Sequence, residues 1–252
     1  MGVVVVHAHV EEGVGEEDGG TGEASRATSA QTPQTSADPQ RGKAEQGEGD
    51  GPVSPGPDSV NAGTYPLARP LFIYSTGSII QEKPQVGDFI NFYLTNVNDE
   101  IIDVGYFPAS GVALDEARTA WLEATGGEAM AATDTGSAVS TSMAELPEVD
   151  PLAVTGDIIT AGSSTVFPLS EAMAARFQDE GYPDNITIDS IGSGAGFERF
   201  CVEGETDISN ASRPIKDSEV ESCQSIGRDP IEFRVGTDAL AVTVSAENDF
   251  VD

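Results

Sequence analysis

The 252-residue sequence has few basic residues, since 12 Lys and Arg stand against 43 Asp and Glu, and its formal net charge is -31. Nucleic acids and anionic membranes bind protein surfaces that are rich in Lys and Arg. We therefore expect neither a nucleic acid nor an anionic membrane surface as a partner. A charge of this size also makes copies of a protein repel one another in solution.

Histidine is nearly absent, and both copies, His7 and His9, lie in a segment whose composition predicts disorder. A Ser-His-Asp or Cys-His device would therefore lack its base in the part of the chain that is predicted to fold. The carboxylates are spread along the whole chain, so no pair is distinguished for acid–base catalysis. We predict a binding protein rather than an enzyme, with no metal and no cofactor.

Cysteine is scarce too, and the 2 copies, Cys201 and Cys223, are too far apart for a CxxC motif. They also lack the neighbours of a zinc site. Two interpretations stay open, namely two buried thiols or one structural disulfide formed in an oxidising compartment. The sequence has no run of about 18 apolar residues, the length of a membrane helix. The Val3–Val6 run lacks the basic flank and the long apolar core of a signal peptide, so we predict no export signal in this sequence.

The composition divides the chain into four segments. Residues 1–57 contain mostly Gly, Glu, Ser, Thr, Gln, Pro and Asp, with few apolar residues that a core could bury, and we predict disorder. Residues 126–154 are again rich in small and polar residues and predict a flexible linker. The segments 58–125 and 155–252 carry the apolar patterns of folded structure.

Within 58–125, the apolar run at 71–74 predicts a buried strand. Apolar residues then recur at helical spacing from Val86 to Val97. A short extended piece at 104–108 precedes a second helix at 114–124, with Ala117 and Trp121 on its buried face.

Within 155–252, predicted strands and helices follow one another through short loops. Strands are predicted at 157–161, 186–189, 206–210, 231–235 and 239–244, and helices at 168–179, 197–202 and 216–223. Strands that alternate with helices indicate an α/β fold with a mainly parallel sheet and flanking helices.

Three loops of this unit have a composition suited to binding an anion at the carboxyl ends of strands, where α/β sheets bind ligands. Residues 162–166 (GSSTV) and 190–196 (SIGSGAG) each lead from a strand into a helix, where free backbone N–H groups favour an anion. Residues 210–214 (NASRP) follow the next strand and add a hydroxyl and a guanidinium. Ser and Thr before a helix are often only N-caps, so each loop alone is ambiguous. Three such loops at successive strand ends favour one anion site.

The residues at 161–168, 190–197 and 206–215 occur in an order and at a spacing that resemble the opening portion of periplasmic phosphate-binding proteins of the phosphate ABC transporter. This resemblance runs from about residue 158 to residue 250. The segment 58–122 resembles the closing portion of the same family, through residues 65–74 (YPLARPLFIY). The resemblance implies one lobe of a type II periplasmic-binding-protein fold, which that family builds from both ends of its chain.

The family's closing portion therefore precedes its opening portion in this sequence. Two interpretations follow: the chain is a piece of a tandem protein, or a natural permutation that forms one compact lobe. We favour the first, because residues 251–252 stop where the family would cross into its second lobe.

The resemblance implies a set of phosphate-binding residues, which are Ser164, Thr165, Val166, Ser193, Gly194, Ser212 and Arg213. The first two loops would give hydroxyl and backbone donors, and Arg213 would add charge. Ser212 stands where some relatives carry an Asp that accepts a hydrogen bond from protonated phosphate, so the choice between phosphate and sulfate has no explanation in this pattern. The resemblance also implies that Cys201 and Cys223 pair as a disulfide.

The function that the resemblance implies is capture of inorganic phosphate for an ABC importer. The permease subunits would be partners, and the location would be periplasmic or extracellular at the cell surface. Without the second lobe the site would be incomplete, so we expect weak or no binding by this chain alone. The alternatives are an exported phosphatase-like enzyme, which the lack of histidine opposes, and a scaffold or adhesion lobe that binds no anion.

Overall fold

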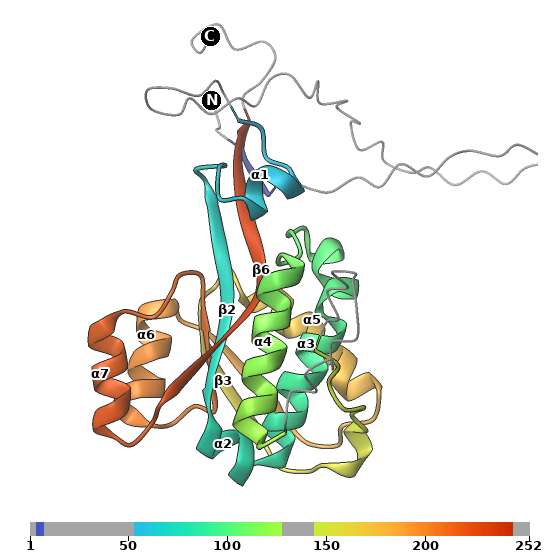
Figure 1. Ribbon diagram of the computed structural model, residues 1–252, viewed down its shortest axis with the longest axis vertical. Helices are drawn as coiled ribbons and strands as arrows, with labels where there is room; N and C mark the ends of the chain where they lie inside the picture. Colours follow the sequence, from blue (N-terminus) through green and yellow to red (C-terminus); the bar gives the residue numbers. More distant parts are fainter. Residues whose placement is uncertain (1–3, 8–52, 128–143, 244–252) are drawn as a thin grey trace, which may run out of the picture.

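The computed structural model describes residues 4–7, 53–127 and 144–243, arranged as one sheet with helices on its two faces (Figure 1). The strand order is β1-β6-β2-β5-β3-β4. The strands are β1 (Val4–His7), β2 (Ala68–Thr76), β3 (Ile158–Gly162), β4 (Ile186–Ser190), β5 (Ile208–Ala211) and β6 (Pro230–Thr243). Most of the segment predicted to be disordered, the linker residues 128–143 and the chain after residue 243 lie outside the described residues.

The strands run as in a mainly parallel sheet, with β2 and the short edge strand β1 reversed. β3 is parallel to both β4 and β5, whereas β2 is antiparallel to both β5 and β6. β6 therefore runs in the same direction as β3, β4 and β5. The prediction of an α/β fold with a mainly parallel sheet is confirmed.

Helices cover both faces of this sheet. Figure 1 shows α6 (Ser193–Glu198) and α7 (Asp217–Ser225) on one side, and α3 (Pro84–Val104), α4 (Gly111–Thr125) and α5 (Phe167–Asp179) on the other. The remaining helical turns are α1 (Pro57–Asn61), α2 (Gly77–Glu82), η1 (Pro151–Ala153) and η2 (Arg199–Glu203). In the part of the chain with described positions, no helix is both long enough and apolar enough to cross a membrane.

The two family-like segments share one core. β2, from the earlier segment, lies between β5 and β6 of the later one, where Phe72 is in register with Ala211 and Arg234. On the face of the sheet that α3 and α5 cover, the rings of Phe89 and Phe177 meet at a centroid distance of 5.4 Å. Both rings are buried, so removing them from water contributes to holding the segments together.

Two sequence-based expectations need correction. The segment predicted to be disordered includes Val4–His7, which forms β1 along the end of β6. The strands predicted at 231–235 and 239–244 are one continuous strand, β6. Gly236 does not form a turn between them. Its missing side chain instead leaves space for α3 to pack against the strand. A Cβ at Gly236 would lie 2.2 Å from Cδ1 of Ile101 in α3.

A disulfide joins Cys201 in η2 to Cys223 in α7, and both residues are buried. The side chain of Arg228 fixes the same region, because its guanidinium donates to the C=O groups of Phe200, Gly204 and Thr206 at 2.7–2.8 Å. The cross-link and the arginine together hold η2, which follows the helix that begins at the second of the three loops.

Replacing both cysteines with serine should destabilise the folded chain. The cysteines are separated by 22 residues, and closing a loop of that length in the unfolded chain is worth about 3 kcal/mol in the chain-entropy account. Urea unfolding of Cys201→Ser/Cys223→Ser should show the loss, whereas Ser218→Ala, at an exposed position of α7, should leave the midpoint unchanged. An unchanged midpoint for the double variant would contradict the cross-link's role.

Candidate functional site

The β3 loop (residues 163–166) begins where Gly162 ends β3, and Ser163 organises it. Ser163 is buried, and its Oγ accepts hydrogen bonds from the N–H of Thr165 at 3.2 Å and of Val166 at 3.4 Å. These bonds stabilise the turn that leads into α5. Ser164 is exposed at the tip of the loop, and its N–H has no acceptor among the described residues. The loop therefore presents a free N–H and the hydroxyls of Ser164 and Thr165 at the edge of the sheet.

The β4 loop (residues 191–192) leads into α6. Its two N–H groups donate to the C=O of Gly162 at 2.9 and 2.7 Å, which ties the loop to the end of β3. The first hydrogen bond of α6 runs from Gly196 to Gly192. The N–H groups of Ser193, Gly194 and Ala195 come before it, and among the described residues they have no acceptor. Gly194 is exposed, and the space around it is open.

The β5 loop (residues 212–216) contacts the start of α6. The Ser212 N–H donates to Oγ of Ser193 at 3.2 Å, and the two hydroxyl oxygens lie 3.5 Å apart. The structure thus brings Ser193 and Ser212 directly together. Both side chains are half-buried, so their hydroxyls lie at the boundary between the core and the open edge.

The three loops meet at the carboxyl ends of β3, β4 and β5 because the backbones approach unusually closely there. Gly162 has a φ of +145°, and a Cβ on it would lie 2.1 Å from the C=O oxygen of Asn210. Ser163 N–H donates to that same oxygen at 2.8 Å. On the other side, a Cβ at Gly196 would lie 2.5 Å from the Cα of Gly162. Only glycine fits at Gly162, since it needs both the positive φ and the space.

Asn210 also lies at this edge, although it is not among the phosphate-binding residues that the resemblance implies. It is 1% exposed, and its side-chain Oδ1 has no hydrogen-bond partner in the described part of the structure. A buried oxygen without a donor is costly, so the position gains from a donor near the loops. The sequence carried a partial signal, because Asn210 opens the polar run at the end of β5.

Arg213 is not a free cation, because it is paired with a carboxylate. Its Nη1 and Nη2 donate to the two carboxylate oxygens of Glu219 at 2.8 and 2.6 Å. Its guanidinium also lies over the ring of Phe197, 5.2 Å from the centroid. The bidentate pair neutralises most of the positive charge that Arg213 was expected to add to the anion site. Arg213 therefore fixes the β5 loop to α7.

The ion pair shifts the pKa values of both partners. Burial alone would raise the pKa of Glu219, but the hydrogen bond from Arg213, the backbone N–H of Lys216 and the nearby positive charges outweigh it. The pKa of Glu219 therefore lies below its ordinary value. The hydrogen bond to Glu219 raises the pKa of Arg213, against an opposing effect of burial.

Tyr106, which follows α3, links the end of that helix to the β3 loop. Its hydroxyl donates to the C=O of Thr165 at 2.8 Å. Burial raises the pKa of Tyr106, and the negative charge of Asp238 raises it further, while Arg69 acts in the other direction. Asp238 is itself buried and paired with Arg69 at 2.6 Å. The tyrosine remains a neutral donor that holds the loop at physiological pH.

The arrangement can bind a small anion through hydroxyl and backbone N–H donors. Among the described residues, no group of three or more His, Cys, Asp and Glu side chains is placed to hold a metal ion.

Comparison with known proteins agrees with the geometry. Residues 129–251 match the model of a PBP superfamily domain. Protein SphX of Synechococcus elongatus is 53% identical over 92 residues, which cover 36% of this chain and 27% of that protein. Phosphate-binding protein PstS of Staphylococcus saprophyticus is 40% identical over 97 residues, covering 38% and 30%. The chain spans less than a third of the length of these relatives.

A solved structure extends the comparison to most of the chain. The phosphate-binding protein of a phosphate ABC transporter from Streptococcus pneumoniae superimposes with a TM-score of 0.52 at 23% identity. The match covers 78% of this chain and 60% of that one. At this identity the likeness shows the fold alone, which is PBP-like.

The lowered pKa of Glu219 predicts a pH-dependent contribution to stability. The Glu219–Arg213 pair stabilises the folded state above the unfolded pKa, near 4.5, and this contribution is lost as the pH falls through the lower folded pKa. Glu219→Gln should therefore reduce the free energy of unfolding at pH 7 by about 1–2 kcal/mol.

The difference between Glu219→Gln and the unchanged chain should shrink as the pH falls below 4.5. Urea unfolding at several pH values measures it. Glu221→Gln, an exposed change on the same helix, is the matched control. A difference that is as large at pH 3 as at pH 7 would show that the pair's charge is not responsible.

Proposed function

Because the chain carries a PBP-like domain, we propose that it captures inorganic phosphate without catalysis, as part of the solute-binding component of an ABC importer. The observation that carries the proposal is the meeting of three donor-bearing loops at the carboxyl ends of β3, β4 and β5. The names of the matched relatives support phosphate as the anion.

Phosphate would lie between the start of α5 and the start of α6. Ser164, Thr165 and Val166 would donate from one side, and Ser193 and Gly194 from the other. The bond from Val166 to Ser163 Oγ is long, at 3.4 Å, so this N–H is available for exchange to a stronger acceptor. Hydrogen bonds to an ionised acceptor are about twice as strong as neutral ones, which favours the exchange.

Ser212 and Arg213 would complete the site from the β5 loop. The hydroxyl of Ser212 lies against Ser193 and would donate to the same anion. Arg213 would act mainly by holding this loop in place, because Glu219 balances its charge. Neither residue is a carboxylate that accepts a proton from phosphate. Selectivity against sulfate would then depend on another acceptor, and Oδ1 of Asn210 is the buried acceptor at this edge.

The site would be one half of a cleft. In this proposal a second lobe closes over the anion, and permease subunits receive the loaded protein. The chain would act outside the cytoplasmic membrane, in the periplasm or at the cell surface. The charge of -31 would slow the approach of phosphate, an effect that salt screens.

Calorimetric titration with phosphate, and with sulfate as the control, tests the proposal. Half a cleft should bind phosphate with a dissociation constant of roughly 1 mM or weaker, which is a binding free energy of about -4 kcal/mol. Ser193→Ala should weaken binding about threefold to tenfold, the value of one hydrogen bond. Ser218→Ala, at an exposed position of α7, serves as the control.

Two results would count against this proposal. Equal affinity for phosphate and sulfate would remove phosphate selectivity. A folded chain that binds neither anion, even after a second lobe from a PstS relative is fused to it, would favour a scaffold. Restored affinity in the fusion would support the half-cleft.

A further inference from the structure

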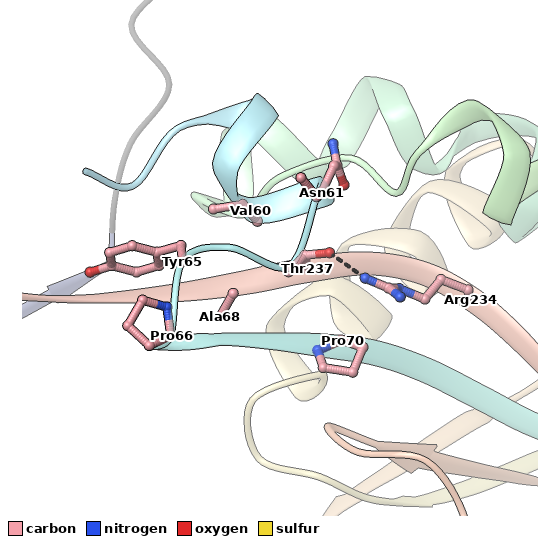
Figure 2. A pocket seen from close by; sticks show the side chains of 10 residues that line it. Val60, Asn61, Tyr65, Pro66, Ala68, Pro70, Arg234 and Thr237 are labelled. Carbon is pink, nitrogen blue, oxygen red and sulfur yellow. Dashed lines mark hydrogen bonds between the residues drawn. The ribbon is translucent and has the colours of Figure 1, made fainter. Parts of the chain in front are cut away.

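A pocket of about 350 Å³ lies beside the β2–β6 pair, between α1 and the strands (Figure 2). It is lined by residues of α1 and the following turn, by the start of β2, and by Arg234 and Thr237 of β6. None of the residues that line it belongs to the β3, β4 or β5 loops. It is therefore separate from the proposed phosphate site.

Arg234 is the charged residue of this pocket. Its Nη2 donates to Oγ1 of Thr237 at 2.8 Å, as Figure 2 shows, and its Nε donates to the C=O of Gly236 at 3.3 Å. A guanidinium has five N–H donors. These two bonds leave both hydrogens of Nη1 and the second hydrogen of Nη2 available to another acceptor. The remaining edge is the fork that matches the two oxygens of a carboxylate.

Arg234 has no carboxylate within ion-pair distance in the described part of the chain, although acidic residues far outnumber basic ones. The described arginines that do pair with carboxylates are Arg69, Arg176, Arg199 and Arg213. Burial lowers the pKa of Arg234, and the charge of Glu232 opposes that shift. Glu232, however, accepts a hydrogen bond from the hydroxyl of Tyr74. An arginine with a free fork that lines a pocket is a ready partner for an external anion.

The other walls of the pocket combine polar and apolar groups and are held in place. Val60 and Tyr65 are buried, and the Tyr65 hydroxyl donates to the C=O of Leu240 at 2.7 Å. Pro66 and Pro70 add two rigid rings. These proline rings suit the apolar body of a ligand better than a hydrated dianion, whose remaining oxygens would lose water there without gaining donors. The side-chain amide of Asn61 adds a polar group above Arg234 in the view of Figure 2.

We propose that this pocket binds a small organic carboxylate. The Nη1–Nη2 edge of Arg234 holds the carboxylate group, the amide of Asn61 donates to it, and the apolar part of the ligand lies against Pro66 and Pro70. The proposal does not depend on phosphate binding, since its residues and those of the loops do not overlap.

Ligand-observed ¹⁹F NMR with the full chain tests this site. The probe is 4,4,4-trifluorobutyrate, and 4,4,4-trifluorobutyramide is its neutral control with the same apolar body. The acid should bind, with a shifted and broadened signal, and the amide should bind at least tenfold more weakly. Arg234→Gln should weaken binding of the acid at least tenfold, and Asn61→Ala about threefold. Arg199→Gln removes a positive charge outside the pocket and should have no effect.

Several outcomes would overturn the assignment. The first is that the chain binds the acid and the amide equally well. The second is that an Arg234→Gln variant, shown by circular dichroism to be folded, binds the acid as tightly as the unchanged chain. The third is that Arg234→Gln and Arg199→Gln weaken binding of the acid equally. The last would mean that net charge alone draws the probe. Displacement of the probe by an equal concentration of phosphate would assign the pocket to inorganic anions instead. The exposed position of Asn61 makes its variant a test that does not depend on stability.

Discussion

The structure depends on the placement of β2, a strand antiparallel to both of its neighbours, between β5 and β6. Its Phe72 is in register with Ala211 on one side and with Arg234 on the other. Without β2, the edges of both neighbours would present unpaired backbone groups, and the segments 58–125 and 155–252 would share no sheet. Because β2 is antiparallel, its beginning lies at the same edge as the carboxyl ends of β3, β4 and β5. The two candidate binding sites are therefore found toward the same edge of the sheet.

The loops of the anion site are close because the backbones that carry them are close. Gly162 touches the backbone of Asn210, and Gly196 in turn fits against Gly162. This contact brings the starts of α5 and α6 together, so that free N–H groups of both helices are directed to one region. Arg213 and Glu219 then hold the third loop against α7. The site is built from backbone geometry first and from charge second, which suits a chain with a net charge of -31.

Local sequence patterns predict much of the fold and of the anion site. The alternation of strands and helices after residue 155, and the polar loops at the strand ends, depend on residues near one another in the sequence. What depended on distant residues could not be predicted. Gly236 resembles a turn residue until Ile101 of α3 packs against it, and β1 has its partner in β6, at the other end of the chain. For Arg213 a local signal existed, since Glu219 lies six residues later, at the start of α7.

The central claim is that one anion is held jointly by the β3, β4 and β5 loops. Backbone amide ¹H–¹⁵N spectra recorded during a phosphate titration test it most directly. The account predicts that the shifted resonances cluster at residues 163–166, 192–195 and 211–213, with one dissociation constant for all three groups. Shifts at one loop alone, or different dissociation constants for the three loops, would contradict a shared site.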